Sequence, residues 1–162
     1  MSQLAPIEIR LTEEGHRRLT DELERLRFVE HPRIAERLRD AYDSGDAAET
    51  GLVSLIRHEE DSINRRIARL EAQLATATIV REGDLDPDVV QVGSRVVVSR
   101  RGESTRRSYC VVSPAESDPR SGYLSSQSPL GRALLGRRRG DVVRFEGPER
   151  VEQVRVESVS AG

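Results

Sequence analysis

Two apolar series with helical spacing occupy the first half of this chain and leave it few ways to fold. Within each series the apolar residues recur mostly at intervals of three, four or seven, which places them on one face of an α-helix. A short polar turn around Gly45 separates the two series. Each helix has one apolar face that only the other can cover, so we predict an antiparallel coiled-coil hairpin over residues 1–81. The first series is Leu19, Leu23, Leu26, Ile34, Leu38 and Tyr42, and the second is Leu52, Ile56, Ile63, Ile67, Leu70 and Leu74.

Local signals set the limits of the two helices. Thr12 precedes the first series and is of a type that caps helix N-termini. Pro32 interrupts the first helix and is expected to bend it. Gly45, inside a polar cluster, suits the left-handed conformation that ends many helices. Because helices of about 30 residues are roughly 45 Å long, the hairpin carries this turn far from both chain ends.

The polarity pattern changes after residue 81. An acidic segment containing a proline, 82–93, is predicted to be a linker. Short apolar runs of strand length follow at 95–99, 108–112, 142–145 and 151–159. Ser128, Pro129 and Gly136 have the types that cap, begin and end a short helix. The predicted fold class is therefore α+β, with the coiled coil followed by a small antiparallel-sheet domain over residues 94–162.

Composition excludes several classes of protein. A single cysteine, Cys110, rules out a disulfide framework, and its apolar surroundings indicate a buried strand thiol. Three Tyr, two Phe and no Trp argue against a base-stacking surface for nucleic acid. No stretch approaches the about 20 apolar residues of a membrane-spanning helix. We expect a cytoplasmic monomer with no membrane partner and no independent nucleic-acid binding.

Carboxylates gather at the predicted turn. Asp43, Asp46 and Glu49 lie among small residues, where a rigid arm could deliver them into a partner's cavity. The spacing of Asp46 and Glu49 also fits a capping box at the start of the second helix. Three carboxylates on a turn make an incomplete cage for Mg²⁺, so we expect no metal and no cofactor in the isolated protein.

The block Ser128-Pro-Leu-Gly-Arg-Ala-Leu-Leu-Gly-Arg-Arg-Arg-Gly-Asp141, together with the hairpin and its acidic turn, resembles the bacterial Gre family of transcript cleavage factors. The likeness runs from about Leu11 to Val159. It implies an FKBP-like C-terminal domain that docks on RNA polymerase at the rim of the secondary channel, and a coiled coil that enters this channel. By resemblance, the contacts with the polymerase fall on Ser126, Ser128, Pro129 and Leu130.

The tip matches the family motif only in part. The family pattern Gly-Asp-Leu-x-Glu-Asn-Ala-Glu-Tyr corresponds here to Gly45-Asp46-Ala47-Ala48-Glu49-Thr50-Gly51-Leu52-Val53. Asp46 and Glu49 match the two acids that, in the family, act in trans by helping the polymerase hold its second Mg²⁺. The family's Asn, second Glu and Tyr are replaced, and Gly51 near the helix start is expected to cost roughly 1 kcal/mol relative to alanine. We therefore expect weak or no stimulation of RNA cleavage.

The resemblance implies a Gre-like transcription factor that modulates or inhibits transcription from the secondary channel. Such a factor is no enzyme itself, the Mg²⁺ belongs to the polymerase, and the tip can meet the RNA 3′ end inside the complex. One alternative is a genuine cleavage factor that uses Asp46 and Glu49. Another is a prolyl isomerase, for which only Tyr109, Tyr123 and Phe145 could line an aromatic pocket. The last is a coiled-coil adaptor that does not contact the polymerase.

Overall fold

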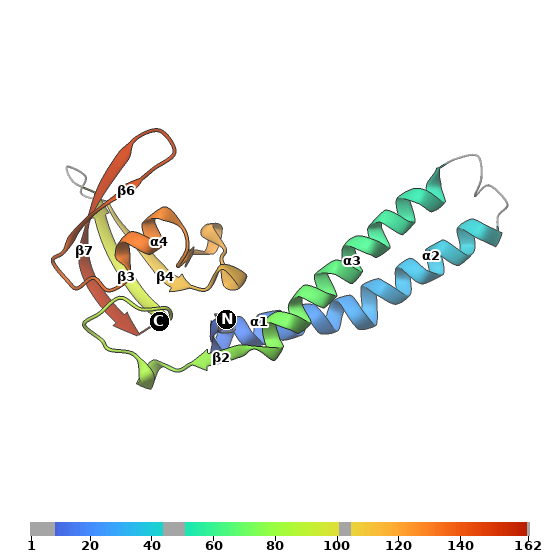
Figure 1. Cartoon of the computed structure of the whole chain (residues 1–162), viewed down its shortest axis with the longest axis horizontal. Helices are drawn as coiled ribbons and strands as arrows, with labels where there is room; N and C mark the ends of the chain where they lie inside the picture. Colours follow the sequence, from blue (N-terminus) through green and yellow to red (C-terminus); the bar gives the residue numbers. More distant parts are fainter. Residues whose placement is uncertain (1–8, 44–50, 101–104, 162) are drawn as a thin grey trace, which may run out of the picture. The chain divides into compact units, whose positions relative to one another are not determined.

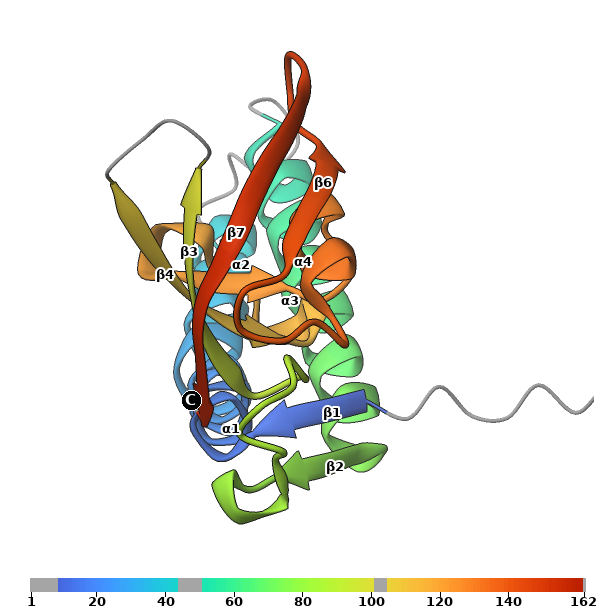
Figure 2. The ribbon, with the colours of Figure 1, turned by 90° about the vertical axis from the view of Figure 1, so that its left-hand side faces the viewer.

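The computed structural model describes residues 9–43, 51–100 and 105–161, shown in Figures 1 and 2. The chain forms two compact units. One is the helical segment Arg17–Thr76, and the other joins the described residues up to His16 with those from Ala77 onward. The helical unit is thus shorter at both ends than the predicted hairpin, residues 1–81. Within the described ranges, no helix is both long enough and apolar enough to span a membrane.

The first helical run consists of α1 (Glu13–Arg25), a π-helical turn (Leu26–Glu30) and α2 (His31–Asp43). The predicted N-cap is confirmed, because Thr12 Oγ1 accepts a hydrogen bond from the Gly15 N–H at 2.9 Å. Pro32 has no N–H to offer the carbonyl of Phe28, and the wider π-helical turn lies where the hydrogen-bond ladder loses this bond. The disruption predicted at Pro32 therefore takes the form of a π-helical turn within one helical run.

The second helix, α3 (Leu52–Ala75), returns beside α2 in the opposite direction (Figure 1). Its 24 residues span about 36 Å. The predicted seam is confirmed over most of its length but shifts by one residue near the tip. Tyr42 and Leu52 are 48% and 43% exposed, and their neighbours Ala41 and Val53 pack inward instead. The cluster at this end consists of Ile34, Ala41 and Ile56, with Leu38, Val53 and Ile63 packed against it.

Ion pairs across the hairpin join its two helical runs. Arg66 donates two hydrogen bonds to the Glu22 carboxylate, at 2.7 and 2.8 Å. These bonds and the charge of Arg66 hold the pKa of Glu22 below its usual value, against the opposing effect of burial. The same pairing raises the pKa of Arg66. Arg37 and Glu59 form a second pair at 2.8 Å. The forked Arg66–Glu22 pair favours one alignment of the two helices, because both bonds require the same register.

The other unit contains two sheets. β1 (Ile9–Thr12) and β2 (Ala77–Val80) pair in parallel, with Ile9 opposite Ala77 and Thr12 opposite Val80 (Figure 2). The larger sheet has the strand order β5-β4-β3-β7-β6. Its pairings are antiparallel except for β4 and β5, which are parallel, so the α+β class is confirmed but the sheet is mixed. Its strands are β3 (Ser94–Arg100), β4 (Arg106–Val112), β5 (Tyr123–Ser125), β6 (Val142–Glu146) and β7 (Val151–Ala161).

The core of this unit lies on one face of the larger sheet, where α4 (Pro129–Leu134) inserts the fully buried Leu134. Val90 belongs to this core, although segment 82–93 is predicted to be a linker. Its N–H donates to the Arg137 carbonyl and its carbonyl accepts from the Gly136 N–H, both at 2.8 Å. The C-terminal end of segment 82–93 is therefore part of the packed sheet unit. Cys110 is buried, as predicted.

Candidate functional site

The predicted tip residues lie in the sequence at the end of α2 or between α2 and α3. Asp43 is the exposed last residue of α2. Gly45, Asp46 and Glu49 lie outside the residues that the structure describes. Within the ranges 9–43, 51–100 and 105–161, no three His, Cys, Asp or Glu side chains gather closely enough to hold a metal ion.

The start of α3 differs from the prediction. Its N-cap is Gly51, which adopts a left-handed conformation with φ 66° and ψ 2°. The carbonyl of Gly51 accepts the N–H of Leu55 at 3.1 Å. Asp46 and Glu49, the predicted capping box of this helix, lie outside the residues that the structure describes. The predicted cost of Gly51 is wrong in sign, because glycine is the residue least strained at this φ.

The first turn of α3 presents apolar side chains. Leu52 is exposed, whereas Val53 packs into the seam between the helices. Neither can donate or accept a hydrogen bond through its side chain. Nearby, Arg57 Nη2 donates to the Tyr42 hydroxyl, with the guanidinium carbon 5.9 Å from the ring centroid. Arg57 and the exposed Tyr42 thus contact each other near the described part of the tip.

The predicted docking block is a short, tightly built helix. Ser128 is the N-cap of α4 and Pro129 its first residue, as predicted. Ser128 Oγ accepts the Gly131 N–H at 3.0 Å and donates to the Ser125 carbonyl at 2.7 Å. The Ser126 N–H is bonded to the Val112 carbonyl at 2.7 Å, which ties the turn to β4. Pro129 is left exposed at the surface.

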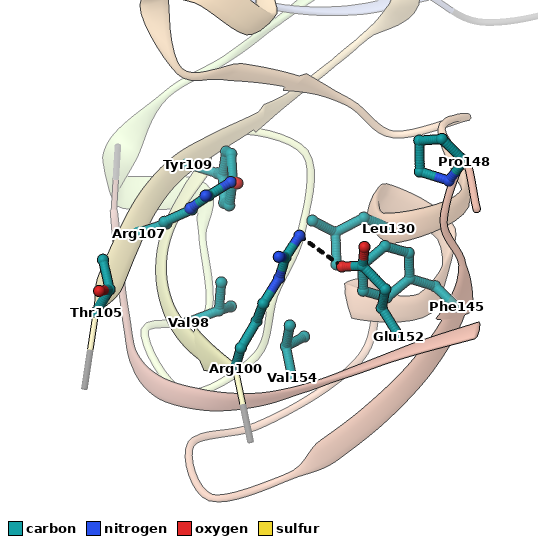
Figure 3. Close-up of a pocket in the computed structure, with 10 residues that line it drawn as sticks. All are labelled: Val98, Arg100, Thr105, Arg107, Tyr109, Leu130, Phe145, Pro148, Glu152 and Val154. Carbon is teal, nitrogen blue, oxygen red and sulfur yellow. Dashed lines mark ion pairs between the residues drawn. The ribbon is translucent and has the colours of Figure 1, made fainter. Parts of the chain in front are cut away.

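Leu130 connects this block to a pocket of about 150 Å³ beside the sheet (Figure 3). Apolar and aromatic side chains form much of its wall. Arg100 Nη2 lies 2.7 Å from Glu152 Oε2, which pairs the charges without the geometry of a hydrogen bond. The pocket can accept a small apolar group next to a charged pair. It is lined by Val98, Arg100, Thr105, Arg107, Tyr109, Leu130, Phe145, Pro148, Glu152 and Val154.

Two family models match the chain. The N-terminal domain of transcription elongation factors matches residues 9–79, and the C-terminal domain of the elongation factors GreA/GreB matches residues 85–161. The chain belongs to the GreA/GreB family of transcription elongation factors. The family resemblance noted from Ser128 to Asp141 is thereby confirmed.

Relatives of this family member align over nearly all of its length. The transcription elongation factor GreA of Alkaliphilus oremlandii is 37% identical over 153 residues, which cover 94% of this chain and 96% of the relative. The GreA of Thermoanaerobacter pseudethanolicus is 36% identical over 146 residues, or 90% of this chain and 93% of the relative. A crystal structure of GreA factor homolog 1 from Thermus thermophilus has 33% identity, covers 95% and 99% of the two chains, and superposes with a TM-score of 0.45.

One residue of this family member escaped the sequence prediction. Glu116 is 3% exposed and bonds the Thr12 N–H and hydroxyl from 104 positions away. The local signal was a threonine N-cap followed at the third position by Gly15, where a capping box has a Glu or Gln. This pattern shows that the acid is missing locally, but nothing in it identifies which distant residue supplies it.

Proposed function

We propose that this protein binds RNA polymerase through its sheet unit and inserts the helical hairpin into the secondary channel, where it modulates transcription with weak or no stimulation of RNA cleavage. The single observation that carries the proposal is the contrast between its two family segments. The Ser128 block forms the capped helix that its sequence predicts, whereas the first turn of α3 has Leu52 and Val53 where the family motif has Glu and Tyr.

The docking surface of the proposal consists of Ser126, Ser128, Pro129 and Leu130. Pro129 is exposed, and its fixed φ requires little ordering when a partner binds. Leu130 leads from this surface to the pocket, which could take an apolar side chain of the polymerase. The hydroxyl of Ser128 is already used within the helix cap, so Ser128 supports the surface by holding its shape.

The first turn of α3 is the reason to expect weak stimulation of RNA cleavage. Asp46 and Glu49 are retained, but the family's second Glu is Leu52 and its Tyr is Val53. Val53 faces the seam and Leu52 is apolar, so neither can orient a water or an RNA group for the two acids. A misplacement of about 1 Å at a reacting group can cost on the order of 100-fold in rate. A hairpin in the channel without productive chemistry would hinder nucleotide addition.

A second candidate is a genuine cleavage factor, in which Asp46 and Glu49 help the polymerase hold its second Mg²⁺ near the RNA 3′ end. The support for this candidate is that both acids are present and that curated relatives are named transcription elongation factor GreA. In both candidates the protein acts as a cytoplasmic monomer, carries no cofactor and is not itself an enzyme.

A backtracked polymerase complex with end-labelled RNA distinguishes the two candidates. We expect saturating protein to slow nucleotide addition while the RNA stays nearly full length. Rapid RNA shortening that is lost in Asp46→Ala would establish the second candidate instead. Pro129→Ala should weaken binding about tenfold, whereas Pro119→Ala, at the start of the 3₁₀ turn Pro119–Ser121, should not. If the wild-type protein does not bind the polymerase at all, both candidates fail and the adaptor hypothesis remains.

A further inference from the structure

The first turn of α1 is capped by two residues that lie far apart in the sequence. Thr12 is the N-cap, and its hydroxyl oxygen accepts the Gly15 N–H at 2.9 Å. In a capping box the third helical residue returns a carboxylate or amide to the N–H of the N-cap. Here the third residue is Gly15, and Glu116 takes over that role. Glu116 Oε1 and Oε2 accept the Thr12 N–H at 3.1 and 3.3 Å, and Oε1 accepts the Thr12 hydroxyl at 2.5 Å.

The Glu116 carboxylate occupies the space that a side chain at position 15 would need. A Cβ at position 15 would lie 1.6 Å from Glu116 Oε1 and 2.2 Å from its Cδ. No side chain can therefore stand at position 15 while the carboxylate keeps its place. Conversely, if the carboxylate is removed, the space above the helix opens and glycine loses its advantage. The stability of the turn should then depend on the two positions jointly.

The Glu116 carboxylate is buried and hydrogen-bonded. Glu116 ends the 3₁₀ turn Pro114–Glu116 and is 3% exposed. Ser113 Oγ donates to its Oε2 at 3.3 Å, in addition to the bonds from Thr12. Burying a carboxylate is unfavourable unless donors replace its water, and here Thr12 supplies two of them. The N-terminus of a helix also favours a negative charge. The hydrogen bonds from Thr12 and the N-terminus of α1 thus stabilise the buried Glu116 carboxylate in this position.

This first turn is also a connection between the two units. Glu13, Glu14 and Gly15 belong to the sheet unit, whereas α1 continues from Arg17 into the helical unit without a break. Two more contacts within the sheet unit hold the same turn. Tyr123 Oη donates to Glu14 Oε2 at 3.0 Å, and Arg81 Nε lies 3.7 Å from Glu13 Oε1. These contacts involve exposed side chains, so Glu116 is the only one of the three anchoring groups that is buried.

We propose that Glu116 is a positioning residue for the hairpin: its carboxylate keeps the first turn of α1 wound, so that the docked sheet unit holds the helix that carries the hairpin. Without it the first turn of α1 frays. This inference rests on the proposed function, because it concerns what the hairpin does once the sheet unit is bound. A frayed turn should leave docking intact and reduce the effect on the polymerase.

Amide exchange on the full-length protein tests the cap itself. Glu116→Ala should raise the exchange rate of the Gly15 amide about tenfold, as expected for loss of a helix cap, and Glu116→Gln should raise it less. Amides of β3 and β7 should be unaffected, which shows that the sheet is folded. Glu149→Ala, which removes an exposed carboxylate of the same unit, is the matched control and should change nothing.

Gly15→Ala should change the amide exchange rate of the first turn in opposite directions in the wild type and in Glu116→Ala. In the wild type it should speed exchange, because the new Cβ displaces the carboxylate. In Glu116→Ala it should slow exchange, because the clash is gone and alanine favours the helix. The same sign in both backgrounds would show that the two positions are not coupled and would overturn the proposal.

Titration of the polymerase separates positioning from docking. With Glu116→Ala, the concentration for half-maximal effect on nucleotide addition should stay within about twofold of the wild type, and the maximal effect should fall several-fold. A raised half-maximal concentration with an unchanged maximum would make Glu116 a docking residue and overturn the inference. An unchanged titration despite faster exchange would reduce its role to local stability. Failure of the wild type to act on the polymerase would refute the proposed function, a result that is visible without any Glu116 variant.

Discussion

Substitution of Gly131 by alanine should damage the docking block, and the size of the effect follows from the contacts of α4. A Cβ at this position would lie 2.0 Å from the Ser125 carbonyl oxygen and 3.0 Å from Ser128 Oγ. The first of these atoms belongs to the backbone and is held by its own bond from Ser128, so it cannot rotate away. The helix and the turn before it must move apart by more than 1 Å to restore an ordinary contact, which begins near 3.4 Å.

The expected cost is about 2–4 kcal/mol. Overpacking of this kind costs about 1–3 kcal/mol. Separation of the two segments also weakens the two hydrogen bonds of Ser128, each worth about 1 kcal/mol. Alanine in place of glycine within a helix returns about 1 kcal/mol. The net destabilisation corresponds to roughly 30- to 1,000-fold faster exchange at amides that open with α4.

The destabilisation of α4 is measured by the amide exchange of Arg132 and Leu135. Their N–H groups bond to the Ser128 and Gly131 carbonyls. Gly83→Ala is the matched control, because a Cβ there meets nothing within 4 Å and the φ of Gly83 is outside the left-handed region. The control should change exchange little. If Gly131→Ala behaves like the control, the close approach of α4 to the Ser125 carbonyl is not what holds this block together.

Three further substitutions test the hairpin. Gly51→Ala should destabilise the start of α3 by about 1 kcal/mol through its left-handed φ alone, since no atom lies near its Cβ, and exchange at the Leu55 amide would show it. Leu70→Ala should lower the free energy of unfolding of the hairpin by about 2–5 kcal/mol in urea titrations followed by circular dichroism, whereas Leu55→Ala, 67% exposed, should change it by less than about 0.5 kcal/mol. Glu22→Gln should cost at most about 1 kcal/mol at neutral pH, because both partners of the pair are partly exposed. Since pairing lowers the pKa of Glu22 in the folded state, this contribution is present above the ordinary glutamate pKa and disappears as the pH falls through the lowered one, so wild type and variant should become equally stable in acid.

The hairpin could be predicted from the sequence because burial along a helix repeats at short, regular intervals. The interval fails near the tip, where Tyr42 and Leu52 fit the pattern but Ala41 and Val53 pack inward. Both predicted residues are larger than their neighbours, and apolar size alone favoured them. The spacing of apolar residues does not contain the contact geometry of the two helices near the turn that joins them.

Features that join distant residues could not be predicted. The pairing of β5 with β4 in parallel depends on the path of the chain between them, which has no apolar period. The sequence near Thr12 shows only that Gly15 stands where a capping-box acid is expected. It does not identify Glu116, which lies 104 residues from Thr12. The turn between the two apolar series located the acids of the tip, whereas only the family resemblance supplied their role and the docking residues.

The parallel pairing of β1 and β2 makes the whole hairpin a crossover connection between two neighbouring strands. Its two helices therefore leave from the end of β1, after Thr12, and return to the start of β2, at Ala77, and these two strands are paired with each other. Insertion or deletion of a seven-residue repeat in both helices at once would change the reach of the hairpin and leave those ends in place. Hairpin length is thus free to vary in evolution, and in protein engineering, independently of the sheet.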